Sequence, residues 1–227
     1  MKSSKNIIVT IDGPAASGKS TTARLVAEKK GWLYLDTGAM YRAMSVKAVQ
    51  NGLSLEDQES IARMADETII DLKTSDQGAR VFVDENEVTD LIRTPEIDKA
   101  VGPVCEVPRV REILVSLQRQ IGEKGSLVAE GRDMGTVVFP NAQVKYYMVA
   151  SIQSRAERRQ KDLEKQGIHM DVRKLAEEIE RRDQRDQSRV NSPLKPANDA
   201  IQLDTSQLSI NEQVEIVLKR IAEIECE

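Results

Sequence analysis

The chain has 227 residues, of which 40% are hydrophobic and 31% charged, enough for one substantial core with small excursions but hardly for two full-sized domains. Its 33 basic and 37 acidic side chains give a formal net charge of -4, which argues against a sequence-independent grip on nucleic acid. Cys105 and Cys226 are its two cysteines, and we expect free thiols. The apolar run 7–11 is too short for a membrane span, so we expect a cytoplasmic protein without a membrane partner.

The first hundred residues alternate between apolar and helical segments. In chain order they predict a strand at 6–12, a helix at 20–30, a strand at 32–36, helices at 38–50 and 55–70, and a hairpin around 81–89. We interpret this stretch, from residue 38 through the hairpin, as an insertion and not as part of the core. The polar start at residues 1–5 carries no structural signal.

The second half begins with an amphipathic helix that follows Pro108 and ends at Gly122, where its apolar residues stop recurring at helical spacing. Strands at 126–129, 144–150 and 201–204 and a closing helix at 210–221 complete the predicted elements. The segment 151–189 contains no apolar run and predicts two exposed helices joined by a turn, which contains the single histidine, His169. We expect His169 to be a structural or solvent-exposed residue.

This order predicts an α/β fold, a P-loop NTPase-type parallel sheet flanked by helices. We expect a core formed by residues 1–36, 102–150 and 190–227. An inserted region at 37–101 would carry the small β element, and a helical segment at 151–189 would lie outside the core.

The strongest motif in the chain is Gly13-Pro14-Ala15-Ala16-Ser17-Gly18-Lys19-Ser20, followed by Thr21. It stands between an apolar strand and a helix, where glycines let backbone N–H groups surround phosphate oxygens and the helix N-terminus favours anions. We expect Lys19 to reach the terminal phosphates of ATP and Ser20 to contact Mg2+.

Other classes of P-loop protein fit less well. No segment matches the D-x-x-G and N-K-x-D patterns of GTPases, and aromatic residues make up only 3% of the chain, which disfavours a nucleic-acid motor. A small-molecule kinase fits better.

Two further motifs, beginning at Asp36 and at Glu130, follow predicted strands and so reach the ligand-binding edge of a parallel sheet. Glu130 occupies the place of an acid near Mg2+, although Thr37 and Arg42 could also be a helix cap and a surface charge.

The motifs together resemble the bacterial cytidylate kinase family. The resemblance rests on the P-loop, D-T-G-A-M-Y-R from Asp36, P-R-V-R from Pro108, E-G-R-D-M-G-T-V-V-F-P from Glu130, and the pair Arg182 and Asp186. It spans nearly the whole chain. It implies a nucleoside monophosphate kinase fold, in which 37–101 is the monophosphate-binding region and 151–189 is a mobile lid.

The resemblance also implies roles for individual residues. Thr37, Tyr41 and Arg42 would flank CMP, and Arg111 and Arg132 would hold its phosphate or its base edge. Asp133 would accept from the amino group of the base. Arg182 and Asp186 would bind the sugar, and Arg189 would bind the phosphate. A carboxylate at position 133 suits the amino group that cytosine presents. Catalytic roles fall to Lys19, Arg132, Arg182 and Arg189, metal contacts to Ser20 and Glu130, and lid contacts with the nucleotide to Arg155 and Arg159.

Several points stay open at this stage. Arg158 has nearly the same claim as Arg159, and Gly102 stands where the family often has a serine near the base. The implied activity is transfer of a phosphoryl group from ATP to CMP or dCMP by a monomer. A kinase for another acceptor such as UMP, or a non-catalytic ATP-binding regulatory module, is the alternative.

Overall fold

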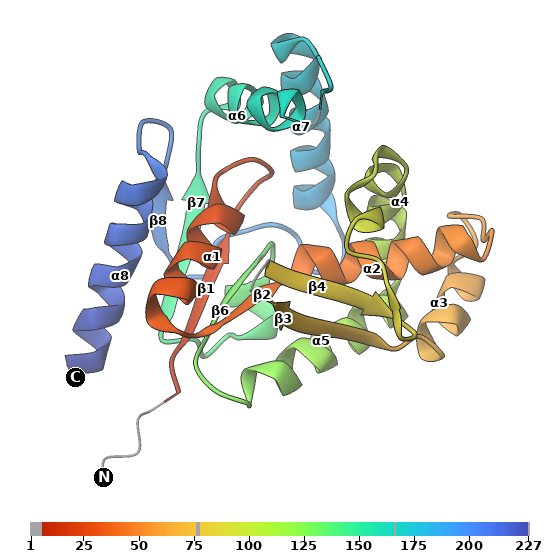
Figure 1. Cartoon of the computed structure of the whole chain (residues 1–227), viewed down its shortest axis with the longest axis horizontal. Helices are drawn as coiled ribbons and strands as arrows, with labels where there is room; N and C mark the ends of the chain where they lie inside the picture. Colours follow the sequence, from red (N-terminus) through yellow and green to blue (C-terminus); the bar gives the residue numbers. More distant parts are fainter. Residues whose placement is uncertain (1–5, 76–77, 166, 227) are drawn as a thin grey trace. The chain divides into compact units, whose positions relative to one another are not determined.

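The structure, a computed structural model, describes residues 6–75, 78–165 and 167–226. The polar start at residues 1–5 lies outside the described residues. The chain forms two compact units, one from residues 1–35 and 124–227 and the other from residues 36–123. Figure 1 shows the order of the elements along the chain.

The first unit is built on a five-stranded sheet in the order β2-β6-β1-β7-β8. Its strands are β1 (Ile8–Asp12), β2 (Leu33–Asp36), β6 (Leu127–Gly131), β7 (Val144–Val149) and β8 (Ile201–Asp204). Parallel pairing joins β6 to β1, β1 to β7 and β7 to β8. The predicted parallel α/β fold is therefore confirmed, with β1 in the centre of the sheet.

The hydrophobic core of this unit lies between the sheet and two helices, α1 (Lys19–Lys30) and α8 (Ile210–Cys226). Val9 and Ile11 of β1 are fully buried there, as are Val217 and Ile221 of α8. β1 is buried from Val9 to Asp12, as suits the central strand of a parallel sheet that is covered by helices. This packing holds the end of β1, and the loop that follows it, in a rigid frame.

Two more helices of the first unit, α6 (Ile152–Glu164) and α7 (Val172–Ser188), pack side by side (Figure 1). The sequence predicts both helices and the turn between them, but it predicts them as exposed, and this is wrong in part. Apolar residues occur singly at helical spacing and form a small core of Ala156, Leu163, Leu175 and Ile179. Isolated apolar positions in a strongly charged segment are still enough to make an amphipathic face.

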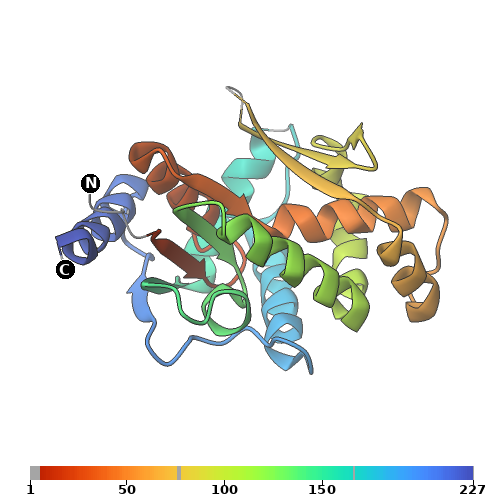
Figure 2. The ribbon, with the colours of Figure 1, turned by 90° about the horizontal axis from the view of Figure 1, so that it is seen from below.

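The second unit consists mainly of helices. These are α2 (Thr37–Gln50), α3 (Gln58–Asp66), the short 3-10 turn η1 (Leu91–Arg93), α4 (Pro95–Glu106) and α5 (Pro108–Gly122). Figure 2 shows α2 and α5 lying side by side. A separate antiparallel sheet, in the order β3-β4-β5, contains β3 (Ile70–Ser75), β4 (Gly78–Val83) and β5 (Asn86–Glu87).

The structure corrects three expectations in this unit. The helix predicted to reach residue 70 ends at Asp66, and the chain continues as β3, which pairs with β4 to extend the predicted hairpin. Helix α4 was not predicted; it starts at Pro95, whose fixed φ suits a first helical position. Helix α5 packs against α2, α3 and α4, so it belongs to the second unit, whereas we expected residues 102–123 in the core.

In the described part of the chain, no helix combines the length and apolar character needed to cross a membrane. Cys105 is buried and Cys226 is exposed, and neither takes part in a disulfide within the described residues.

Candidate active site

The glycine-rich motif forms a loop between β1 and α1. Gly13 needs to be glycine because a Cβ there would lie 2.3 Å from the carbonyl oxygen of Met148 on β7. The hydroxyl of Ser17 donates to the carbonyl oxygen of Pro14 at 3.0 Å across the loop, and Gly18 is the N-cap of α1 with φ 95°. The loop thus places the start of α1, with its unpaired N–H groups, at the end of the central strand.

Lys19 and Ser20, the first residues of α1, meet Glu130 from β6. The Nζ of Lys19 lies 3.8 Å from Oε2 of Glu130 and donates to the carbonyl oxygen of Pro14 at 3.2 Å. The hydroxyl of Ser20 donates to Oε1 of Glu130 at 2.8 Å. This meeting follows from the sheet, because β1 and β6 are parallel neighbours with Ile11 paired to Glu130.

The ammonium group of Lys19 lies in a site that disfavours its charge. Its pKa is lowered to about 8, first by burial and then by the positive charge of Arg132, while Glu130 acts in the opposite direction. A buried lysine close to a guanidinium gains from any additional negative charge. The phosphates of a nucleotide would supply that charge.

Ser20 and Glu130 together form the oxygen donor set expected for Mg2+. Within the described residues there is no group of three or more His, Cys, Asp or Glu side chains that could hold a metal ion. Mg2+ usually takes one or two protein oxygens and completes its coordination with water and substrate phosphates. The paired hydroxyl and carboxylate fit such a site.

A cluster of arginines surrounds Asp186 of α7. The Nε of Arg132 donates to Oδ2 of Asp186 at 2.7 Å, and Arg189 pairs with Oδ1 of the same carboxylate. Arg182 is exposed on the same helix, and its charge acts on both Asp186 and Lys19. Arg182 and Asp186 are four residues apart on one face of α7, and Arg189, predicted to continue that face, is instead the C-cap residue just after the helix. The structure therefore brings together the residues predicted from the motifs at 130 and 182.

Two arginines of α6 contact the phosphate-binding loop. Arg155 is buried and donates to the carbonyl oxygen of Ala15 at 3.3 Å while pairing with Asp183 of α7. Arg158 donates to the carbonyl oxygen of Ser17 at 3.3 Å and to both oxygens of Thr205. Arg158, which the sequence could not separate from Arg159, thus contacts the loop directly.

The candidate residues of the second unit form a cluster of their own. The guanidinium of Arg111 lies over the ring of Tyr41, 5.4 Å from its centroid, and both residues are buried. Arg42 donates to Asp98 at 2.5 Å and to the carbonyl oxygen of Ile92 at 3.0 Å. The N-cap of α2 is Asp36, which accepts from the N–H of Ala39, so the alternative that Thr37 caps the helix is wrong.

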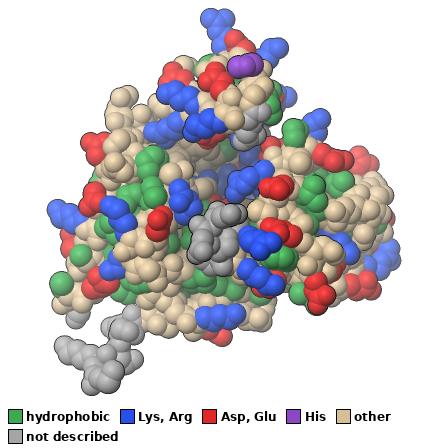
Figure 3. All heavy atoms as spheres, in the orientation of Figure 1, with side chains coloured by type: hydrophobic (Ala, Val, Ile, Leu, Met, Phe, Trp, Pro, Cys, Tyr) green, Lys and Arg blue, Asp and Glu red, His purple; other side chains and the backbone are tan. Residues whose placement is uncertain are grey.

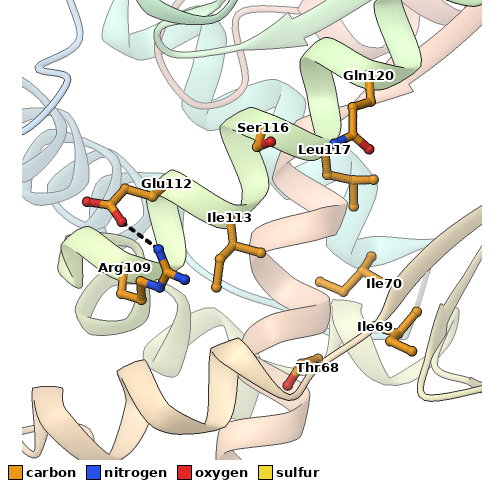
Figure 4. A pocket seen from close by; sticks show the side chains of 9 residues that line it. All are labelled: Thr68, Ile69, Ile70, Arg109, Glu112, Ile113, Ser116, Leu117 and Gln120. Atoms are coloured by element: carbon orange, nitrogen blue, oxygen red, sulfur yellow. Dashed lines mark hydrogen bonds and ion pairs between the residues drawn. The ribbon is translucent and has the colours of Figure 1, made fainter.

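Two further surface features of the described residues, a groove and the exposed His169, contain none of the predicted site residues. A groove of about 440 Å³ in the second unit lies between α5 and residues 68–70, with Arg109 and Glu112 paired at its edge (Figure 4). His169 is exposed, as expected, and lies near lysine and arginine side chains on the surface (Figure 3).

Three acids of these clusters were missed by sequence reasoning. Asp12, Asp98 and Asp183 are each bound to a candidate residue or to the turn that carries one. Asp12 had a signal, because it is an acid at the end of an apolar strand, directly before the phosphate-binding loop. Asp98 and Asp183 had none, since isolated acids in helical segments are usually solvated.

The parallel sheet, the phosphate-binding loop after its central strand and the paired Lys19, Ser20 and Glu130 define a P-loop kinase. The family model described as cytidylate kinase matches residues 9–223, and the chain belongs to that family.

Known proteins agree with this assignment over nearly the whole length. The cytidylate kinase of Bacillus subtilis strain 168 is 46% identical over 217 residues, which cover 96% of this chain and 97% of the relative. The cytidylate kinase of Carboxydothermus hydrogenoformans is 46% identical over 213 residues, with 94% and 96% covered. A gluconokinase structure from Sinorhizobium meliloti 1021 has a TM-score of 0.50 at 12% identity, covers 97% of this chain and 94% of that chain, and shows the fold alone.

Asp186→Asn tests the electrostatics of the arginine cluster. Burial raises the pKa of Asp186, but Arg132 and Arg189 outweigh burial, so the pKa lies below its ordinary value of 3.8. The ionised carboxylate therefore stabilises the fold above about pH 4, and this contribution is lost as pH falls through the lowered pKa. We expect the variant to lose roughly 3 kcal/mol at pH 7.

Thermal unfolding of both proteins between pH 7 and pH 2 checks this expectation. The gap between their midpoints should shrink as pH falls. Asp162→Asn, at an exposed acid of α6 paired with Lys165, is the control and should unfold like the wild type. A gap for Asp186→Asn that stays constant with pH would contradict the assignment.

Proposed function

We propose that this protein transfers the γ-phosphoryl group of ATP to CMP and dCMP, giving ADP and CDP or dCDP. The proposal rests on membership of the cytidylate kinase family. The single observation that carries it is the contact of Lys19 and Ser20 with Glu130, the first residue of the segment that also holds Arg132 and Asp133. One short segment thus links the donor loop to the residues proposed to read the acceptor.

The donor ATP is bound by the loop from Gly13 to Thr21. Its backbone N–H groups and the N-terminus of α1 bind the phosphates, and Lys19 adds a cation that lies beside Pro14 and Glu130. Arg155 and Arg158, which already contact the loop backbone, lie where they can reach the donor. We keep Arg159 as a further candidate, and residues 151–189 as the lid.

Ser20 and Glu130 would hold Mg2+ with oxygen ligands of the kind that this ion prefers. Bound there, Mg2+ would neutralise negative charge that builds up on the phosphates during transfer. The protein's own part is to keep the hydroxyl of Ser20, at the start of α1, beside the carboxylate of Glu130 in β6.

Recognition of the acceptor CMP is proposed for the turn after β6 and for α7 with the residue that follows it. Asp133 accepts from the amino group of cytosine, Arg182 and Asp186 bind the sugar, and Arg132 and Arg189 bind the phosphate. We keep Thr37, Tyr41, Arg42 and Arg111 as further candidates for binding CMP. Gly102 cannot supply the hydroxyl that the family often has near the base, so recognition of the amino group falls to Asp133.

The reaction needs no general base. The second pKa of a phosphate monoester is about 6, so the acceptor is largely a dianion at neutral pH. What the protein supplies is alignment of two anions, cationic charge for a loose transition state and exclusion of water. Lys19, Arg132, Arg182 and Arg189 supply that charge.

An ADP-release assay with ATP, Mg2+ and a panel of acceptors tests the proposal. We expect fast ADP formation with CMP and dCMP, slow formation with UMP and AMP, and almost none without an acceptor. A higher rate with UMP would favour the alternative acceptor. Binding of ATP without any acceptor-dependent ADP would favour a regulatory module. A cytoplasmic, monomeric protein stays a prediction from the sequence.

Removal of single cations should reduce turnover. Lys19→Ala or Arg182→Ala is expected to lower kcat by at least ~10²-fold, because each removes charge that stabilises the transition state. Steady-state kinetics with CMP measures the effect. Arg181→Ala is the matched control, since Arg181 is the exposed neighbour of Arg182 and donates only to the backbone of Glu177. Near-normal kcat in Lys19→Ala would remove its assigned role.

Asp133→Ala should act on selectivity. Asp133 is 3% exposed, and its loss removes the acceptor for the cytosine amino group, worth about 10-fold or more in discrimination. The ratio of kcat/KM for CMP to that for UMP checks this, with Arg181→Ala as the same control. An unchanged ratio would mean that another residue reads the base.

A further inference from the structure

Asp12 is a buried acid that the proposed chemistry does not use. It is the last residue of β1, is 4% exposed and stands directly before Gly13 of the phosphate-binding loop. Its Oδ1 accepts from the N–H of Met134 at 2.9 Å, and its Oδ2 accepts from the N–H of Gly135 at 2.8 Å. Both oxygens are therefore committed to the turn that follows β6.

The backbone of Asp12 holds the other end of the same turn. Asp12 pairs with Gly131 in the parallel ladder between β1 and β6. The chain at Gly131 and at Met134 is thus fixed by one residue, and Arg132 and Asp133 are the two residues in between.

We propose that Asp12 is a positioning residue for acceptor recognition, which fixes Arg132 and Asp133 so that they can bind CMP. This inference rests on the proposed function. It assigns Asp12 no contact with substrate. Its side chain acts through the turn alone.

The side chain must be a carboxylate for this role. An amide of the same shape has one acceptor oxygen, and its NH₂ group would face one of the two backbone N–H donors. A buried donor without an acceptor is strongly unfavourable, so the turn would shift to relieve it. Residues 132 and 133 would shift with it.

The negative charge of Asp12 does not stabilise the folded state. A purely structural carboxylate would be expected to stabilise it, so the proposed role differs from a structural one. The pKa of Asp12 is raised to about 6, because burial, together with the charge of Asp133, outweighs the two N–H groups and Arg132. Tyr147 of β7 lies close enough for the charge of Asp12 to act on it, and Lys145 of β7 lies beside Gly135 of the same turn. Because the pKa is raised, ionisation of Asp12 makes the folded state less stable as pH rises through about 6.

The turn also packs closely against β1 at Gly135. A Cβ on Gly135 would lie 3.1 Å from the hydroxyl oxygen of Thr10 and 3.4 Å from Oδ2 of Asp12. The distance to Thr10 is tighter than an ordinary contact, and the distance to Asp12 is at the limit of an ordinary one, so a methyl group would push the turn away from β1. Gly135→Ala therefore disturbs the same contact between Asp12 and the turn, by a change in the turn and not in Asp12.

Steady-state kinetics of Asp12→Asn tests the proposal. We expect KM for CMP to rise about 10-fold or more and the preference for CMP over UMP to fall by a similar factor, because one buried N–H loses its acceptor. Binding of a fluorescent ATP analogue should stay within about threefold of wild type, since the side chain of Asp12 bonds to the turn and not to the loop. This binding also shows that the variant is folded.

Asp57→Asn is the matched control. Asp57 is an exposed acid that also accepts a backbone N–H, from Ser60 at the start of α3, but the turn that it holds carries no proposed site residue. Its KM for CMP and its preference for CMP should equal those of the wild type.

Gly135→Ala is the second test of the proposed role of Asp12, to be used if Asp12→Asn does not fold. It should raise KM for CMP and lower the preference for CMP in the same direction, by about threefold. Unchanged KM and unchanged preference in a folded Asp12→Asn, or in Gly135→Ala if Asp12→Asn does not fold, would overturn the inference. Failure of the proposed function would look different, because the wild type itself would then form no CDP.

Discussion

The parallel pairing of β1 with β6 is the constraint on which the rest of the site depends. It joins two strands that are far apart in the chain and aligns Ile11 with Glu130 and Asp12 with Gly131. The carboxyl ends of parallel strands meet at one edge of a sheet, so the phosphate-binding loop and the turn after β6 emerge together. The contacts of Lys19 and Ser20 with Glu130 follow from this register, as does the anchoring of residues 134 and 135 by Asp12.

Positive charge near the loop is held in place by carboxylates. Arg132 and Arg189 share Asp186, Arg155 pairs with Asp183, and in the second unit Arg42 pairs with Asp98. Paired arginines are oriented by their partners, so less rotamer freedom is lost when they bind a phosphate. The carboxylates also offset repulsion between neighbouring guanidiniums. Lys19 also lies beside a carboxylate, that of Glu130. Burial and the charge of Arg132 nevertheless lower its pKa to about 8.

Many residues of the candidate site could be predicted because they occur in short sequence motifs. The loop at Gly13–Ser20 and the segment at Glu130 combine residue types that phosphate binding requires with a position after an apolar strand. Helix α4 and strand β3 were missed for a physical reason. The segment at 95–106 includes Gly102 and Pro103, both poor helix formers, and Ile70 falls at the point where a helical pattern changes to an alternating one. Packing within the second unit decides both.

The sequence by itself determined the class of fold, the phosphate-binding loop and the residues suited to a second phosphorylated ligand, since these depend on local periodicity and on residue chemistry. Tertiary structure alone decided that Arg158 contacts the loop, that α5 belongs to the second unit and that Asp12 holds the turn carrying Arg132 and Asp133. Each of these depends on which segments meet in space. Such meetings follow from sheet order and strand register, which the pattern of a single strand or helix does not contain.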